Sequence, residues 1–320
     1  MIDIVTINSP ELGLTYHFDK DNSEYLLDDN GISISELKSN YNTYSVYGKI
    51  GKSMDDPQLN SGIEITLTGW IIHNMITPLD IKKQRLVAFF NPLFKLNLAF
   101  NHFTISGYPK STVKFGDNRK TNNDKFCKYQ VVIFCPYPGF QYDKLNEVYI
   151  PINYRSPYMN EPAIYPDNNK VVMINYKGSL PCPIGIEFHT NRLTSDPTWT
   201  TDGALIQSLE VDQTTGQYNL SKVKEQFSTR SLTLTAPRLY TSGFSDLPSG
   251  WYSYTYDEET GEPINYTSVI SEISLANPAF MNLYPGKNAF KITDISGGEL
   301  DCYELRLMYY SMFMYPKEDW

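Results

Sequence analysis

The feature that most constrains the fold is an alternation of apolar and polar residues. It is clearest in IEITLT at residues 63–68, and it recurs at residues 128–135 and 304–309. Successive side chains of a β-strand point to opposite faces of a sheet, so this pattern is typical of strands with one buried and one wetter face. Shorter β-prone runs stand at residues 171–174 and 232–236. The chain is therefore predicted to be mainly β.

Turn signals separate these strands. The polar segments DQTTGQ (212–217) and DEETGE (257–262) place a glycine after a polar pair, which is typical of hairpin ends. In FMNLYPGKNAFKI (280–292), Pro285 fixes φ for entry into a turn and Gly286 tolerates positive φ. Two apolar segments are thus predicted to flank a tight reversal, as in a β-sandwich.

One segment, TPLDIKKQRLVAFF at residues 77–90, has a helical pattern instead. Its apolar residues from Leu79 to Phe90 recur with the helical period. Thr77 and Pro78 are predicted to be the N-cap and the first helical residue. The Asn-Pro pair that follows is expected to end the helix, because the residue before a proline is pushed out of the α region.

Length and charge limit the function. The 320 residues suffice for one large or two ordinary domains, and a hydrophobic content of 41% is enough to build cores. There are 27 Lys and Arg against 36 Asp and Glu, and this net charge of -9 opposes the basic surface expected of a phosphate binder. The start lacks a basic and apolar leader, and no long apolar run follows. We expect neither sequence-specific nucleic-acid binding nor membrane insertion.

Motifs for catalysis and cofactors are missing from the sequence. It has no GxSxG nucleophile motif, no GxGxxG and no P-loop spacing. The acidic stretch DKDNSEYLLDDNG (19–31) lacks the glycine and glutamate that a calcium loop needs at its sixth and twelfth positions. A surface calcium held by scattered carboxylates stays open. We predict no catalytic residue, no cofactor and no dedicated metal site.

The four cysteines, Cys127, Cys135, Cys182 and Cys302, form no CxxC pair. If residues 126–135 are one strand, the first two cysteines share a face but lie about 26 Å apart at roughly 3.3 Å per residue, beyond disulfide reach. Buried free thiols are predicted in preference to a bridge or a reactive site.

Proline and tyrosine gather between residues 136 and 166, a segment that holds six of the chain's 20 prolines. Proline stiffens an extended path, and tyrosine offers a large amphipathic contact area. We predict an ordered strap in inter-domain or inter-subunit contact, with four interface residues: Tyr137, Tyr142, Tyr149 and Tyr154. The domain boundary is placed inside it, giving domains of residues 1–147 and 148–320.

A second aromatic group, in LPSGWYSYTY and the loop SDPTWTTDG, admits another function. Trp251, Tyr254 and Trp199 are candidates for a surface that stacks on sugar rings. Alternate aromatic residues on one strand face also suit a core or a subunit interface. The sequence leaves these alternatives open.

Taken in order, several segments resemble the distal tail proteins of long-tailed bacteriophages. The segments are GIEITLTGWI, KKQRLVAFFNP, FTISGYPKSTVKF, KYQVVIFCPYPGF, VVMINYKGSLPCPIGIEF, FMNLYPGKNAFKI and YELRLMYYSMF. In that family the first four belong to an N-terminal belt domain of strands and one helix, and the others to a galectin-like C-terminal β-sandwich. The resemblance covers most of residues 1–190 and 268–315. The segment 191–267 departs from it as an extended part of the second domain.

The resemblance implies a structural virion protein and not an enzyme. Six copies would form a ring that connects the tail tube to the baseplate or tail-tip adsorption apparatus and lets DNA pass. Its partners would be the tube protein, a tail-associated hub protein and receptor-binding proteins. The protein would be made in the host bacterial cytoplasm and reside at the tail tip of the virion.

Two other interpretations compete with the hub. One is a carbohydrate-binding tail module that stacks host cell-wall glycan on Trp199, Trp251 and Tyr254. The other is a glycan-degrading tail enzyme, for which the sequence offers only its abundant carboxylates.

Overall fold

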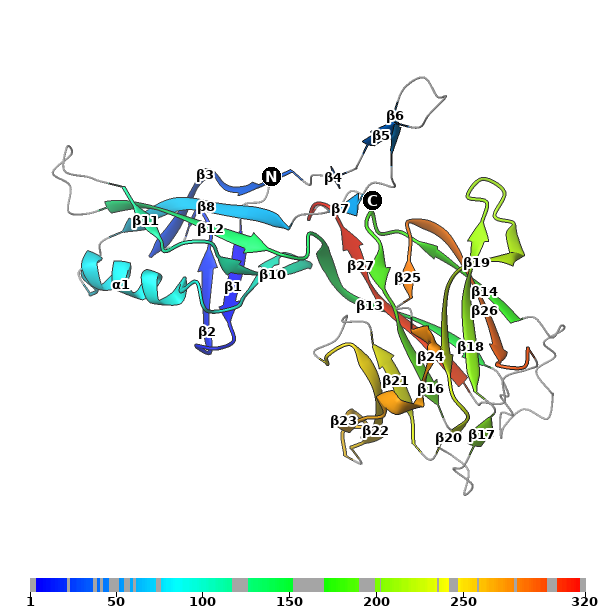
Figure 1. The fold of residues 1–320 in the computed structure, drawn as a ribbon. Coiled ribbons are helices and arrows are strands. Elements are labelled where there is room, and N and C mark those ends of the chain that lie inside the picture. The colour runs from blue at the N-terminus through cyan, green and yellow to red at the C-terminus, as the bar shows by residue number, and fades with distance from the viewer. Residues whose placement is uncertain are drawn as a thin grey trace. The chain divides into compact units, whose positions relative to one another are not determined.

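The protein is described by a computed structural model (Figure 1) that covers residues 4–21, 24–36, 39–40, 43–45, 52–54, 58–59, 62–72, 76–116, 126–151, 170–189, 199–201, 203–234, 236–241, 247–257, 259–278, 281–297 and 304–316. It forms two compact units. Unit 1 comprises Met1–Asp143 and Phe313–Asp319, and unit 2 comprises Lys144–Met312. The chain leaves unit 1 four residues before the boundary predicted at residue 147, and it returns after Met312.

The chain is mainly β, as the alternation predicted. In unit 1 the main elements are β1 (Val5–Ser9), β2 (Leu14–Phe18), β3 (Tyr25–Ile34), β8 (Ile63–Ile72), α1 (Leu79–Phe89), β9 (Leu96–Phe100), β10 (Phe103–Pro109), β11 (Lys114–Phe115) and β12 (Phe126–Cys135). The strand β13 (Phe140–Pro151) begins in unit 1 and continues into unit 2. Two short ladders, between β4 (Ser39–Asn40) and β7 (Gln58–Leu59) and between β5 (Thr43–Ser45) and β6 (Lys52–Met54), complete the strands described there.

Two antiparallel groups of strands make up unit 1, and β10 belongs to both. One group runs in the order β2, β1, β9, β10, and the other joins β3, β8, β12 and β11. The first part of β10 pairs with β9, whereas Tyr108 and Pro109 at its end pair with β12. A bridge between Asp19 and Leu26 links the ends of β2 and β3. The two groups are thereby held around one interior.

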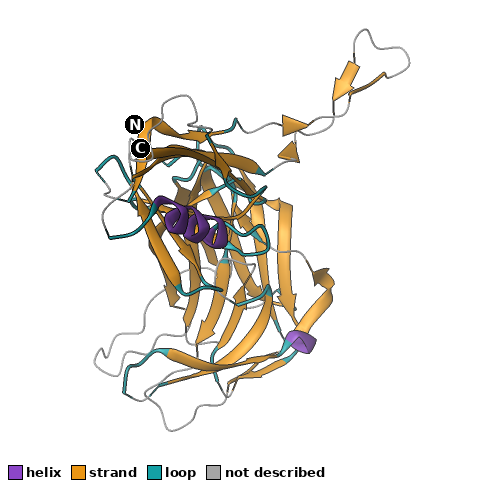
Figure 2. Cartoon of the chain, turned by 90° about the vertical axis from the view of Figure 1, so that its left-hand side faces the viewer, coloured by secondary structure: helices purple, strands orange, loops and turns teal. Residues whose placement is uncertain are grey.

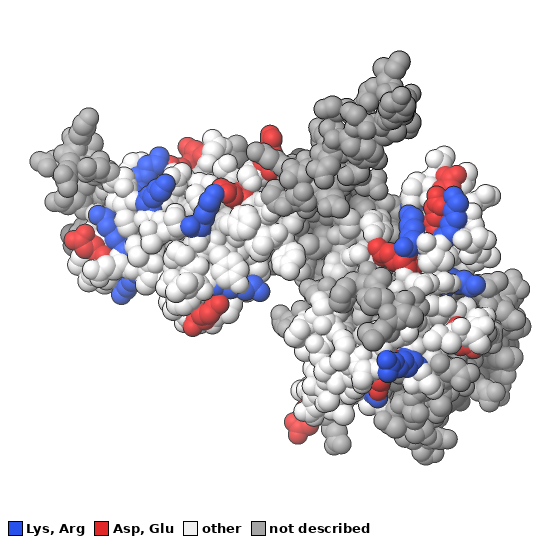
Figure 3. Space-filling view, in the orientation of Figure 1, with Lys and Arg blue, Asp and Glu red and all other residues white. Residues whose placement is uncertain are grey.

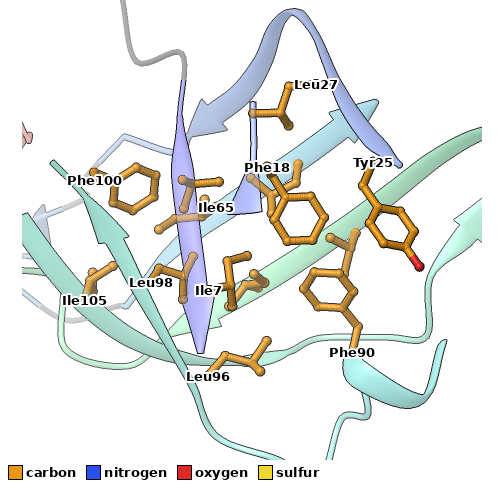
Figure 4. Close-up of a cluster of buried hydrophobic side chains, with 14 of the residues drawn as sticks. Ile7, Phe18, Tyr25, Leu27, Ile65, Phe90, Leu96, Leu98, Phe100 and Ile105 are labelled. Atoms are coloured by element: carbon orange, nitrogen blue, oxygen red, sulfur yellow. The ribbon is translucent and has the colours of Figure 1, made fainter. Parts of the chain in front are cut away.

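That interior is a single apolar core. The ten residues of β8 are buried and half-buried in strict alternation, which confirms the strand predicted around residues 63–68. Figure 4 shows Ile65 pointing at side chains from the other group of strands, among them Ile7, Leu98 and Phe100. Burying apolar surface is the main favourable contribution to folding, so this alternation is what assembles unit 1.

The helix α1, drawn in purple in Figure 2, begins one residue later than predicted. Pro78 has φ -58° and ψ 150°, which is extended rather than helical, so it occupies the N-cap position and Leu79 is the first helical residue. No side-chain hydrogen bond caps the helix. The prediction of Thr77 as the N-cap was therefore wrong. The predicted end is confirmed, because the helix stops at Phe89 before the Asn-Pro pair.

A buried lysine fastens α1 to the neighbouring strands. The side chain of Lys82 has 0% exposure, and its Nζ donates to the carbonyl oxygen of Ile72 at 2.8 Å. The carboxylate of Glu24 lies 3.6 Å from the same Nζ. The hydroxyl of Tyr25 donates back to the Lys82 carbonyl at 3.3 Å. A buried ammonium needs such partners, since its desolvation is costly.

Unit 2 is a β-sandwich. The elements are β14 (Lys170–Tyr176), β15 (Cys182–Pro183), β16 (Gly185–His189), β17 (Trp199–Thr201), β18 (Ala204–Val211), β19 (Tyr218–Thr229), β20 (Leu232–Leu234), β21 (Arg238–Thr241), β22 (Gly250–Tyr256), β23 (Pro263–Ser268), the 3₁₀ turn η1 (Ile270–Glu272), β24 (Ile273–Pro278), β25 (Asn282–Leu283), β26 (Gly286–Asp294) and β27 (Glu304–Phe313). One sheet runs β13, β27, β16, β21, β22, β23, and the other runs β14, β26, β18, β19, β24.

One apolar core joins the two sheets of unit 2. It takes Ile186 and Leu305 from the first sheet and Ile174 and Phe290 from the second. The alternation predicted for residues 304–309 is confirmed, because Leu305 and Leu307 are buried and the intervening Arg306 is only half-buried. The sandwich predicted from turn chemistry is thus formed, but its strands meet differently at one place.

That place is the segment 280–292, predicted to be a reversal between two apolar strands. The turn exists, with Gly286 at φ 95°. Its flanking strands do not pair with each other, because β25 pairs with β15 while β26 pairs with β14 and β18. The Asn288 side chain accepts from the Tyr284 N–H at 2.9 Å and donates to the Tyr284 carbonyl at 2.7 Å. These bonds satisfy a corner at which the chain changes sheet.

The hairpins predicted at DQTTGQ and DEETGE are both present and share one geometry. In each, the aspartate Oδ1 accepts backbone N–H bonds from the second and third residues after it, at 2.7 to 3.1 Å. Gly216 and Gly261 have φ of 78° and 73° and donate to the carbonyls of Asp212 and Asp257. The shared spacing Asp-x-x-Thr-Gly therefore specifies this turn.

Three of the four cysteines are buried free thiols, as predicted: Cys127, Cys135 and Cys182. Burial raises the pKa of Cys135 and of Cys182 to about 12, so both stay protonated at neutral pH. Cys302 lies outside the described residues.

Replacing Lys82 by methionine keeps most of the volume but removes the donor to the Ile72 carbonyl. We expect the free energy of unfolding of unit 1 to fall by about 1–3 kcal/mol, the cost of an unpaired buried polar group. Urea titration would measure it. The control Lys83→Met removes a partly exposed pair with Asp80 and a cation–π contact with Phe115, and it should change the stability by less than about 1 kcal/mol. Equal effects of the two substitutions would contradict the role of Lys82.

The hairpin aspartates should titrate at low pH. Backbone N–H bonds lower the pKa of both aspartates. The main cause is the bond from Thr215 for Asp212 and the bond from Thr260 for Asp257. A carboxyl whose pKa is lower in the folded state than in the unfolded state stabilises the fold at pH values above its unfolded pKa of about 3.9. This stabilisation is lost as the pH falls through the pKa of the folded state. NMR titration should give midpoints below about 3.9. In Asp212→Asn the contribution of that hairpin to acid sensitivity should vanish, and midpoints at or above the unfolded value would disprove the turn's effect.

Candidate interaction site

Trp251, a residue predicted to stack on sugars, is part of the core of unit 2. Its side chain has 0% exposure and lies at ring-centroid distances of 5.4 Å from Phe188 and 5.8 Å from Phe227. Its indole Nε1 donates to the Glu272 carboxylate at 3.0 Å, and Arg238 binds the same oxygen at 3.1 Å. Neither face of the indole is open to a ligand, so Trp251 cannot be a stacking surface in this structure.

Tyr254 is buried too, on the opposite face of the sheet. It is 2% exposed, and its hydroxyl donates to the carboxylate of Glu187 and lies 3.2 Å from the Tyr256 hydroxyl. Burial first, and then the charge of Glu187, raise the pKa of Tyr254 far above its usual value, so the phenol keeps its proton. Trp199 begins β17, which pairs with β20, and its side chain lies outside the described set. The three predicted residues therefore form no common platform among the described side chains.

The same sheet face carries a charged cluster that the sequence did not predict. Arg306 of β27 lies 3.5 Å from Glu187 of β16 and 3.6 Å from Glu147 of β13. Burial alone would lower the pKa of Arg306, but Glu187, Tyr149 and Glu147 raise it, so the guanidinium stays charged. The signal was present in the alternation: Arg306 stands between buried leucines and so had to point to the other face. Its partners come from distant strands, which the sequence could not reveal.

Tyr149 stands at the edge of this cluster and is held in a defined orientation. The Arg306 guanidinium lies 4.7 Å from the ring centroid, and the Tyr149 hydroxyl donates to Glu147 at 2.6 Å. The ring is 51% exposed. An aromatic ring that is held by a cation and is still half exposed loses little entropy when it is covered by a partner. Of the predicted strap residues, Tyr149 is thus both exposed and preorganised.

The remaining strap tyrosines have different environments. Tyr137 is 80% exposed. Tyr142 packs inside unit 1, where its ring centroid is 5.3 Å from Phe103 and 6.5 Å from Phe313. Tyr154 lies outside the described residues. The described part of the segment is mostly the strand β13, in which Tyr142 and Tyr149 serve separate units.

Charges on the surface are interspersed. On the face shown in Figure 3, basic and acidic side chains lie beside one another rather than in separate fields. Lys128 pairs with Asp28 at 3.0 Å in unit 1, and Lys222 pairs with Glu210 at 3.0 Å in unit 2. No three His, Cys, Asp or Glu side chains of the described ranges group so as to hold a metal ion. In the same ranges, no helix has the length and apolar character to cross a membrane.

The fold of two β-rich units is one that is known from phage tail hubs. The Dit protein of phage SPP1, described as a paradigm of the hub adsorption apparatus in phages that infect Gram-positive bacteria, matches with a TM-score of 0.59 and 11% identity. The match covers 97% of this chain and 99% of that chain. At this identity the likeness is one of fold.

Weaker matches come from the baseplate of phage P2 in its activated conformation. With Ca, the TM-score is 0.43 at 10% identity over 96% of this chain and 98% of that one. With Sr, it is 0.41 at 10% identity with the same coverage. Neither supports an argument at such a score. No protein-family model and no curated protein match the sequence.

Truncating Trp251 should show that it belongs to the core. Trp251→Ala is expected to lower the stability of unit 2 by about 3–5 kcal/mol through the cavity it leaves. Tyr149→Ala, the matched exposed aromatic, should cost no more than about 1 kcal/mol, the size of its cation–π contact. Denaturant unfolding would compare them. A mild effect at Trp251, similar to that at Tyr149, would refute its core role.

Proposed function

We propose that the protein is a structural hub of a phage tail, a distal tail protein that connects the tail tube to the baseplate or tail-tip adsorption apparatus. The observation that carries this proposal is the fold shared with the SPP1 Dit protein over nearly all of both chains. The shared region includes unit 1 and unit 2, so the likeness is not confined to a common sandwich. The order of sequence segments supports the same proposal independently.

In this proposal unit 1 is the belt domain and unit 2 the galectin-like domain. Six copies close a ring through contacts between unlike surfaces of neighbouring subunits, which is the contact type that cyclic closure requires. The tube protein, a tail-associated hub protein and receptor-binding proteins attach to the ring. The protein then resides at the tail tip of the virion, after synthesis in the host bacterial cytoplasm.

Exposed aromatic residues are the proposed contact points. Tyrosine and arginine are enriched at the centres of protein interfaces. Tyr149 with Arg306 supplies such a pair in unit 2, and Tyr137 offers an exposed ring at the end of unit 1. Tyr142 is not proposed as a contact point, because it packs against Phe103. It lies on β13, the strand that continues to Tyr149.

The acidic composition suits a ring through which DNA passes. A net charge of -9 per chain repels phosphates, so a lumen lined by such subunits would not retain the genome. The sugar-binding alternative loses its main support, because Trp251 and Tyr254 are buried. We do not carry that alternative forward.

The hub proposal is tested by the assembly state. Light scattering across a concentration series should give a species of about six times the 36.7 kDa chain, as closure of a cyclic ring requires. Negative-stain images should show six-fold rings, and an antibody should label the tail tip of virions. A chain that stays monomeric and is absent from virions would overturn the proposal.

A further inference from the structure

The strand β14 forms one edge of the five-stranded sheet of unit 2. It pairs with β26 over seven consecutive residues, from Lys170 opposite Ile292 to Tyr176 opposite Gly286, without a register shift. No strand of the described ranges pairs with its other side. The backbone N–H and C=O groups of such an edge form a template for another strand.

The backbone of β14 has none of the features that interrupt an edge. It has no proline, no residue with positive φ and no bulge. Edge strands elsewhere in the unit are interrupted. In β23, Pro263 lacks an N–H, Asn265 has φ 56°, and the pairing with β22 shifts register. In β24, Pro278 ends the strand and the pairing with β19 shifts. Proline and bulges of this kind prevent edge-to-edge pairing.

The side chains of β14 suit pairing with a second β14. Ile174 and Tyr176 join the sandwich core, and Met173 points to the other face with 43% exposure. In an antiparallel pair centred on Met173, the facing residues are Val172 with Ile174, Val171 with Asn175 and Lys170 with Tyr176.

This arrangement places no like charges opposite each other. Lys170 is the strand's one charged residue and would face a tyrosine rather than another lysine. Val172 and Ile174 lie on the core side in both copies, so the apolar faces of the two sheets would be continuous. A one-residue slip would place core-facing residues opposite outward-facing ones, so the pleat restricts the pair to registers that keep like faces together, and the register centred on Met173 is one of these.

We propose that β14 is a self-pairing edge at which a second copy of this chain adds antiparallel, with Met173 on the two-fold axis. The contact would join two five-stranded sheets into one of ten strands. It is isologous, because the same patch serves in both partners, and so it differs from the contacts that close a ring. The proposal does not depend on the hub function.

Cysteine substitution tests the register directly. In the pair, the two copies of residue 173 would have Cα atoms about 4.5–5.5 Å apart, within disulfide reach. The copies of residue 175 would lie about 13 Å apart along the strand and could not be bridged. Under mild oxidation, Met173→Cys should give a cross-linked dimer on a non-reducing denaturing gel. Asn175→Cys should give no more than the wild-type chain, which carries the same natural cysteines.

Charge at the axis gives a second test. Because Met173 is exposed, Met173→Lys and Met173→Glu should both fold. Each variant places like charges opposite each other, so light scattering should no longer detect the form in which two copies pair through β14. An equal mixture of the two variants should restore it. Asn175→Lys, which would face Val171, is the matched control and should still pair.

The outcomes separate this proposal from the hub. Equal cross-linking of Met173→Cys and Asn175→Cys would overturn self-pairing. So would charged variants at Met173 that have the same mass as the wild type, both singly and when mixed. Six-fold rings without the cross-link would leave the hub intact and reject the pairing. The cross-link without rings would do the reverse.

Discussion

The strands that build the two cores bury one face and pair their backbones, and both units follow from that requirement. In unit 1 the inward residues of β8 and β12 meet those of β1 and β9, and β10 crosses from one group to the other. In unit 2 the inward residues of two sheets meet in one core. Helix α1 is fastened to this framework by Lys82, whose charge is satisfied by a strand-end carbonyl and a carboxylate. Without the apolar faces of these strands, α1 would have no core to pack against, and Lys82 would not lie beside its two partners.

The outward faces carry what the cores do not use. On one sheet of unit 2, Arg306 is held between Glu187 and Glu147, and Tyr254 donates to Glu187. A partly buried charge is tolerated when opposite charges lie beside it, and the residues of this cluster come from four strands. Its visible consequence is Tyr149, an exposed ring that the cluster orients. Of the aromatic residues predicted to bind sugars, Trp251 faces the core and Tyr254 faces the charged cluster, so these two contribute to stability instead.

Edges decide how such a fold meets other molecules. Proline, positive φ and shifted register interrupt β23 and β24, whereas β14 has a regular edge. A protein that assembles has to distinguish strands that pair from strands that do not, and backbone geometry is the means available to a sheet. In the proposed hub, such control would be needed.

The sequence by itself determined the local structure. Alternation at residues 63–68, 128–135 and 304–309 specified strands and their inward residues, and the Asp-x-x-Thr-Gly spacing specified two hairpin ends. Such features depend on neighbours a few residues away, so they can be read along the chain. The start of α1 was misjudged by one residue, because Pro78 has ψ 150° and is extended rather than helical.

Only the tertiary structure decided which strands meet. The turn at Gly286 was predictable, but the separation of β25 and β26 into different sheets was not. The partners of Arg306 come from β13 and β16, far apart in the chain, and the burial of Trp251 depends on Phe188 and Phe227 from two sheets. An aromatic residue on a strand has the same sequence signature whether its face is covered or open. Which of these applies depends on packing between segments distant in sequence, and no local pattern records that packing.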